Sequence, residues 1–222
     1  LMVVTDGGVL VKGGVIQEVA DYQYLLNRTE NPGSGWDAAS SGSSFTVQEI
    51  PISQRPLTLL PGWIDSHTHL CFAGSRAADY TRRISGMPYL ELLQAGGGIH
   101  ETVRATTAAT SPQLKSLLSR RLQRHLQEGV TTVEVKTGYG LNPQEEMRHL
   151  QVIREVVELG DLTGIAAPML PDVVPTCLAA HAVPEKSDAG SAVDRLQAEL
   201  FPLLTAMDWC RRIDIYIERD AF

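Results

Sequence analysis

Two histidines separated by one residue are the feature of this sequence with the clearest capacity for chemistry. His67 and His69 lie in the segment Asp65-Ser-His-Thr-His, directly after an apolar run that ends at Ile64. Residues two apart in an extended strand project from the same face, so we expect both imidazoles to point at one place. Neutral imidazole is a common ligand of zinc and iron. Taken alone, the pair fits equally well with two surface histidines at the end of a strand.

Three further polar side chains stand near expected strand ends or in an expected loop, namely Arg76, Tyr139 and His181. The planar guanidinium of an arginine suits a carboxylate, because its fork matches both oxygens. Tyr139 and His181 each follow an expected strand, which is where (β/α) barrels build their active sites. In isolation, a solvated loop arginine is the better interpretation of Arg76, and a loop aromatic and a hydrogen-bonded strand-end histidine remain open interpretations of Tyr139 and His181.

The elements that must position these residues alternate between strands and helices. Apolar and β-branched runs predict four strands, around Ile64, Val133, Leu178 and Ile215. Leucines at helical spacing predict a helix over 114–128, and further helices are expected over 144–159 and 192–206. This alternation indicates an α/β fold with parallel strands. Because a complete barrel has eight strands, we expect residues 61–222 to form the first half of a TIM-type (β/α) barrel.

Residues 1–60 are expected to be part of a small β-rich domain that precedes the barrel. Gly13-Gly14 separates two short apolar runs, a pattern typical of a hairpin. The segment 31–44 is rich in glycine and serine and is expected to be a flexible surface loop. This part of the chain is too interrupted to enclose a core of its own.

Composition excludes several functional classes. The chain has 222 residues, of which 43% are hydrophobic, and its 26 acidic and 19 basic residues give a net charge of −7. An excess of acid argues against nucleic-acid binding, and no apolar run approaches the length of a membrane span. The cysteines are three in number and widely spaced: Cys71, Cys177 and Cys210. An odd number of distant cysteines favours buried thiols in a reducing, cytoplasmic setting.

Several sequence blocks together resemble one family. Pro61-Gly-Trp-Ile-Asp-Ser-His-Thr-His69 is similar to the signature of the metal-dependent amidohydrolases. Three later blocks narrow the resemblance to the imidazolonepropionase family: Gly129-Val-Thr-Thr-Val-Glu-Val-Lys-Thr-Gly-Tyr139-Gly, Ala180-His181-Ala-Val-Pro184 and Asp214-Ile-Tyr-Ile-Glu. The resemblance extends over residues 57–222.

The resemblance implies a hydrolase acting on the carbon–nitrogen bond of a cyclic amide. Its small-molecule substrate is 4-imidazolone-5-propanoate, and its product is N-formimidoyl-L-glutamate, in histidine degradation. One divalent metal, zinc or iron, is implied, with hydrolysis by metal-bound hydroxide. The implied roles fall on six residues: metal ligation on His67 and His69, binding of the propionate on Arg76, substrate contact on Tyr89 and Tyr139, and both substrate contact and catalysis at the ring on His181. Lys136 lies on the second strand, where the resemblance places no bridging lysine.

Two alternatives stay open at this point. The chain fits another cyclic-amide hydrolase of the superfamily, in which case a carboxylate-binding Arg76 has little use. It also fits a non-catalytic half-barrel that dimerises through an unpaired strand edge. With only two ligands identified, the chain alone is expected to bind metal weakly and to lack activity.

Overall fold

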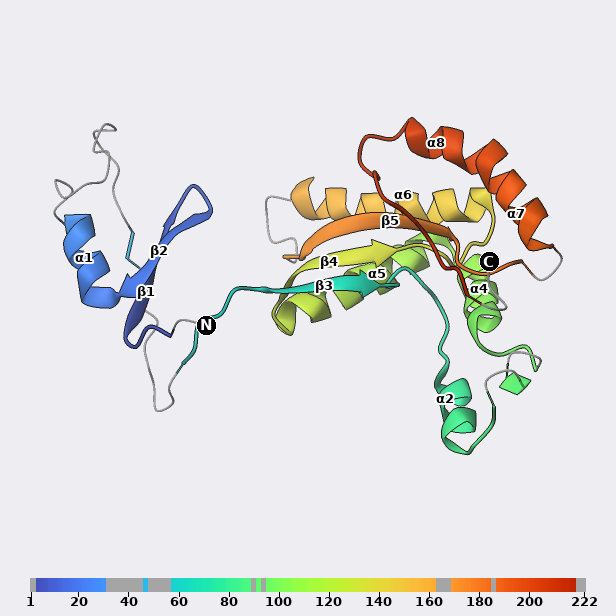
Figure 1. Ribbon diagram of the computed structural model, residues 1–222, viewed down its shortest axis with the longest axis horizontal. Coiled ribbons are helices and arrows are strands. Elements are labelled where there is room, and N and C mark those ends of the chain that lie inside the picture. Colours follow the sequence, from blue (N-terminus) through green and yellow to red (C-terminus); the bar gives the residue numbers. More distant parts are fainter. Residues whose placement is uncertain are drawn as a thin grey trace. The chain divides into compact units, whose positions relative to one another are not determined.

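The computed structural model describes residues 3–30, 46–47, 57–88, 91–92, 95–162, 169–184 and 187–218 (Figure 1). Contacts divide the chain into two compact units, Leu1–Leu59 and Leu60–Phe222. The glycine- and serine-rich segment 31–44 and Tyr89 lie outside the described residues.

The first unit contains a two-stranded antiparallel sheet and one helix. β1 (Gly7–Lys12) pairs with β2 (Val15–Asp21). The connecting glycines have φ values of 58° and 77°, which suits glycine in a tight hairpin turn, so the hairpin prediction is confirmed. The helix α1 (Tyr22–Glu30) was not expected from the sequence. The Asp21 carboxylate accepts the Tyr24 N–H at 3.0 Å and starts this helix.

The second unit is built on a four-stranded parallel sheet. Its strands are β3 (Trp63–Thr68), β4 (Val130–Lys136), β5 (Asp172–Ala180) and β6 (Ile213–Ile215). They lie in the order β3-β4-β5-β6, and each neighbouring pair is parallel. The four predicted strands and their parallel arrangement are thereby confirmed.

Helices connect the parallel strands (Figure 1). Between β3 and β4 lie α2 (Ala77–Ile84), α4 (Ile99–Ala108) and α5 (Ser111–Gln127). The first two were not expected from the sequence. Between β4 and β5 lies α6 (Pro143–Leu162). The last connection contains α7 (Ala189–Arg195), the π-helical turn η1 (Leu196–Leu200) and α8 (Phe201–Thr205).

The helix predicted over 114–128 begins earlier than its leucine pattern does. Thr110 caps α5 by accepting the N–H of Gln113, whose side chain in turn accepts the Thr110 N–H. This reciprocal pair is a capping box, and it satisfies two amides that the helix leaves unpaired. The end is as predicted, because Gly129 follows the helix with a φ of 91°.

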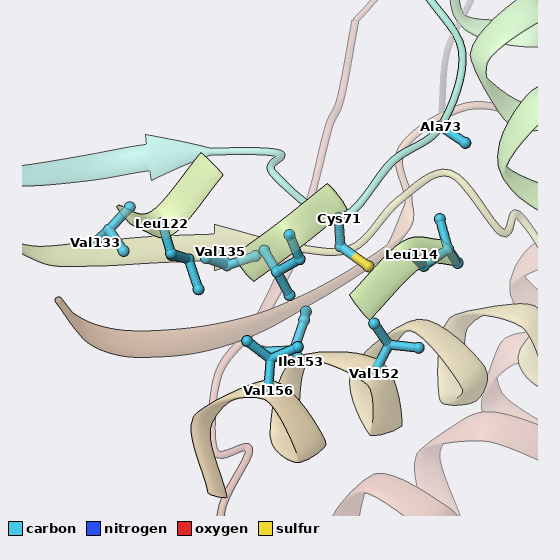
Figure 2. Packing of buried hydrophobic residues seen from close by; sticks show 10 residues of the cluster. Cys71, Ala73, Leu114, Leu122, Val133, Val135, Val152, Ile153 and Val156 are labelled. Atoms are coloured by element: carbon cyan, nitrogen blue, oxygen red, sulfur yellow. The ribbon is translucent and has the colours of Figure 1, made fainter. Parts of the chain in front are cut away.

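One face of the sheet is covered by α5 and α6. Val133 and Val135 of β4 are fully buried against leucines of α5 and against Val152 and Ile153 of α6 (Figure 2). Since side chains alternate along a strand, Glu134 and Lys136 project from the opposite face.

That opposite face carries a charged network. Lys136 Nζ donates to Glu134 at 3.1 Å and to Asp214 on β6 at 2.8 Å. The Thr176 hydroxyl of β5 donates to Glu134 at 2.7 Å. The network links three neighbouring strands. It also engages the Lys136 ammonium in two ion pairs.

The three cysteines are free and buried, which confirms the expected packing role. Burial raises the pKa of Cys71 and of Cys177 to about 12, so both thiols are protonated and poorly nucleophilic near neutral pH. Separately, within the described parts of the chain, no helix is both long enough and apolar enough to cross a membrane.

Candidate active site

Four of the predicted site residues converge where β3, β4 and β5 end. His67 lies in β3 and His69 directly after it, Tyr139 follows β4, and His181 directly follows β5. The rings of His67 and His69 have centroids 5.3 Å apart. His69 stacks on His181 at 4.7 Å, and Tyr139 lies 5.5 Å from His69 and 5.7 Å from His181. The carboxyl ends of neighbouring parallel strands therefore place these side chains together.

Two successive backbone carbonyls orient two of the histidine rings. His69 Nδ1 lies 3.1 Å from the Thr137 oxygen, and His181 Nδ1 lies 2.9 Å from the Gly138 oxygen. A carbonyl oxygen only accepts, so each neutral ring carries its proton on Nδ1. Each Nε2 then keeps a lone pair, which is the arrangement found in histidines that bind metals or accept protons.

Burial keeps both histidines neutral. It lowers the pKa of His69 to about 4, with the neighbouring His181 acting in the same direction. Burial also lowers the pKa of His181, while its hydrogen bond with Gly138 acts the opposite way. Neutral imidazole is the form that ligates a metal or accepts a proton, so these rings are ready for either role near neutral pH.

The loop that carries Tyr139 depends on two glycines. Gly138 has a φ of 114°, and a Cβ there would lie 2.7 Å from His181 Nδ1. A Cβ on Gly140 would lie 2.7 Å from the backbone nitrogen of Glu146. Only glycine allows both approaches. The sequence Gly-Tyr-Gly is therefore what brings this loop against both the β5 end and the start of α6.

Tyr139 is buried, and its ring meets the edge of Phe72 at 6.2 Å. Burial raises the pKa of the Tyr139 phenol, although the positive charges of Arg76 and Arg121 oppose that effect. The hydroxyl therefore stays protonated and is available as a hydrogen-bond donor.

Arg76 is exposed and lies directly before the first residue of α2. Its positive charge acts to lower the pKa of both Tyr139 and His181, after the larger effect of burial on each. The guanidinium thus lies close enough to these two side chains for its charge to affect them. Tyr89, the sixth predicted site residue, lies outside the described part of the chain.

Two aromatic or cationic neighbours of the site were missed by sequence reasoning. Tyr216 follows β6 and meets the His181 ring edge-on, with centroids 6.1 Å apart. Its position directly after a strand is the signal that could have identified it. Arg121 donates to the carbonyls of Leu70 and Phe72 at 2.7 and 2.6 Å and lies over the Phe72 ring. It holds the segment that follows His69.

The buried carboxylate of Glu146 was also missed. It accepts three backbone N–H groups of the loop that carries Tyr139, from Gly138, Gly140 and Leu141. Burial raises the pKa of this carboxyl, while the Thr137 hydroxyl and the three amides oppose the rise. An acidic residue in the first turn of a helix is ordinary, so the sequence carries no sign of this contact.

The donor chemistry of His67 and His69 fits two ligands of a divalent zinc or iron ion. His69 supports this interpretation, because the bond between its Nδ1 and Thr137 leaves Nε2 available. Among the residues that the structure describes, no group of three or more histidine, cysteine or acidic side chains is arranged to hold a metal. The described residues thus offer two ligands, His67 and His69.

Comparison with known proteins identifies curated relatives of one name. An imidazolonepropionase of Syntrophobacter fumaroxidans is 35% identical over 218 residues, covering 97% of this chain and 46% of the relative. An imidazolonepropionase of Brevibacillus brevis is 35% identical over 224 residues, covering 100% of this chain and 48% of the relative. An imidazolonepropionase of Aeromonas salmonicida is 43% identical over 164 residues, covering 73% of this chain and 38% of the relative. The chain spans about half the length, or less, of these relatives. No protein-family model matches it.

Proposed function

The chain is a sequence relative of the imidazolonepropionases, and from that premise we propose that it forms part of the active site of such an enzyme. The reaction is hydrolysis of the ring C–N bond of 4-imidazolone-5-propanoate to N-formimidoyl-L-glutamate, in histidine degradation. The observation that carries the proposal is the convergence of His67, His69, Tyr139 and His181 at the ends of three neighbouring parallel strands.

The proposed architecture is the first half of a TIM-type barrel over residues 61–222, preceded by part of a small β domain over 1–60. A parallel sheet in chain order, with its helices on one face, supports the barrel half. Polar residues of the site sit at the carboxyl end of the strands, which is the functional end of such barrels. Free, buried thiols support a cytoplasmic location.

The proposed cofactor is one divalent metal, zinc or iron, held in part by His67 and His69. Such an ion lowers the pKa of bound water to about 7 and so makes hydroxide available near neutral pH. The rings of His69 and His181 stack beside each other at the end of the sheet.

The proposed substrate contacts follow from the charge and protonation of each group. Arg76 binds the propionate carboxylate with its planar fork. Tyr139, kept protonated by burial, donates a hydrogen bond to the substrate. His181 faces the ring to be opened and accepts a proton at Nε2, because its Nδ1 proton is held by the Gly138 carbonyl. Tyr89 is proposed as a further pocket residue.

A second candidate is a non-catalytic half-barrel that associates with another copy. β3 and β6 are the outer strands of the sheet, and each exposes large apolar side chains. Ile64 is 71% exposed and Ile215 is 48% exposed. Unpaired strands of this kind readily pair with another chain. Sedimentation of the chain over a range of concentrations measures this association.

Binding of two small molecules to the 222-residue chain tests the substrate class. Calorimetry should detect binding of 4-imidazolepropionate, which resembles the substrate but has no ring carbonyl to attack. 4-Methylimidazole, which lacks the carboxylate, should bind more weakly. Equal affinity for the two compounds would favour another cyclic-amide hydrolase, in which Arg76 has no carboxylate to bind.

A further inference from the structure

The carboxylate of Glu146 is completely buried where α6 begins and is surrounded by backbone amides. Oε1 accepts the N–H groups of Gly140 at 2.7 Å and Leu141 at 2.9 Å, and Oε2 accepts that of Gly138 at 3.0 Å. The Thr137 hydroxyl is a fourth hydrogen-bonding neighbour. A buried charge with this many donors is well compensated, so the arrangement is specific to a carboxylate.

These amides belong to the same short loop that orients the two histidines. The Gly138 residue that donates its N–H to Glu146 also presents its carbonyl to His181 Nδ1. The preceding carbonyl, that of Thr137, lies against His69 Nδ1. Glu146 touches neither imidazole, but the peptide unit between Thr137 and Gly138 connects it to His69, and the residue Gly138 connects it to His181.

The loop has a backbone conformation that needs external support. Leu141 has a φ of 53°, which is uncommon for a residue other than glycine, and Gly138 has a φ of 114°. Conformations of this kind persist where the surroundings over-determine them. Glu146 bonds to the N–H groups of both residues, so it holds the loop at the two unusual positions.

We propose that Glu146 is a positioning residue that, through the backbone of residues 137–141, fixes the His181 ring in its Nδ1–H tautomer. This keeps the Nε2 lone pair free to face the substrate. The catalytic meaning of that lone pair rests on the proposed function, whereas the effect of Glu146 on the ring does not. Many side chains could fill this space. Accepting hydrogen bonds from three amides, however, requires both oxygens of a carboxylate.

Glutamine at this position separates positioning from packing. Glu146→Gln keeps the volume, but its amide has one acceptor oxygen and one NH₂ group, which only donates. In either orientation of the glutamine amide, its NH₂ group faces a loop N–H, so two donors oppose each other. The matched control is Glu158→Gln on the same helix, where the glutamate is exposed and pairs with Arg154.

The experiment is ¹⁵N NMR of the histidine rings in the 222-residue chain without metal or substrate, well below the melting temperature. The unmodified chain and Glu158→Gln should show His181 as a single Nδ1–H tautomer. Glu146→Gln should show loss of that single state, with signals of the Nε2–H form and shifted amides at Gly138 and Tyr139. A merely stabilising glutamate would lower the melting temperature but leave the ring signals of the folded variant unchanged, and that result would overturn the proposal.

If Glu146→Gln does not fold, two less disruptive variants at Thr137 test the same proposal. Thr137→Val removes the hydroxyl beside Glu146, whereas Thr137→Ser retains it. The valine variant should show the mixed tautomer and the serine variant the single one, and identical His181 signals in both would contradict the proposal. Because no substrate is present, a failure of the proposed reaction would leave this result unaffected, and the two ideas can fail separately.

Discussion

His69 and His181 stack with their ring centroids 4.7 Å apart and their planes 10° from parallel, although 112 positions separate them in the chain. Their Nδ1 atoms contact the carbonyls of Thr137 and Gly138, two consecutive residues. One loop between β4 and α6 therefore sets the orientation of rings from the ends of β3 and β5. A change in that loop should affect both histidines together.

Gly138→Ala should disturb the site more than the fold. The added Cβ would lie 2.7 Å from His181 Nδ1, at a φ of 114°. We expect a loss of about 1–3 kcal/mol in the free energy of unfolding and displacement of His181. Urea denaturation and the His181 ring signals measure the two effects. Gly86→Ala is the control, because Gly86 has a φ of 95° but nothing within 4 Å of its Cβ position. Equal His181 signals in both variants would contradict the prediction.

Arg76→Lys should impair substrate use and leave stability nearly unchanged. Lysine keeps the charge but has no planar fork for a carboxylate. Loss of a charge-assisted contact of about 1.5–3 kcal/mol corresponds to roughly a tenfold to hundredfold fall in kcat/KM. Kinetics and thermal melting should be measured on the natural gene product that carries this chain. Arg124→Lys, at an exposed pair with Glu128, should change neither value. An unchanged kcat/KM in Arg76→Lys would remove the residue from the site.

Asp214 should contribute stability that depends on pH. Its hydrogen bond from Lys136 lowers the pKa of the Asp214 carboxyl, so this contribution is complete above the unfolded pKa of about 3.9. It disappears as the pH falls through the lower folded-state value. Asp214→Asn should therefore cost about 1 kcal/mol or less near neutral pH and nothing in strong acid. Urea denaturation across this range tests the sign, with the exposed Asp194→Asn as the control. A stability cost of Asp214→Asn that grows as the pH falls would refute the prediction.

Metal binding by the 222-residue chain should be weak. A catalytic zinc site usually has three protein ligands, and the described residues place two suitable imidazoles together, His67 and His69. Zinc titration should give low affinity that falls further in His69→Ala. His125→Ala is the control, since that ring contacts the Arg121 carbonyl instead. Tight binding of one zinc per chain would mean that another residue, with His181 the first suspect, completes the coordination.

The strands and the two long helices could be predicted because burial leaves a periodic pattern in the sequence. β5 shows where that pattern fails. The sequence predicted this strand around Leu178, yet β5 begins at Asp172 and includes Pro175, a residue that is uncommon inside a central strand. β6 pairs with β5 only from Cys177 onward, so Pro175 lies outside that ladder.

The convergence of His67, His69, His181 and Tyr139 could be predicted because each lies at or just after the end of a predicted strand. Glu146 and Arg121 could not be, because both act on backbone groups. Their partners are the amides and carbonyls of loops, which any sequence possesses. Contacts of this kind depend on where the chain folds back and leave no pattern of residue types.

The most direct test of the account is turnover of 4-imidazolone-5-propanoate by the natural gene product that carries this chain, loaded with zinc or iron. The account predicts formation of N-formimidoyl-L-glutamate. It also predicts that His69→Ala loses both metal and activity, whereas His181→Ala keeps the metal and loses activity. A folded, metal-loaded protein that leaves the substrate intact would contradict the account, as would full activity in His181→Ala.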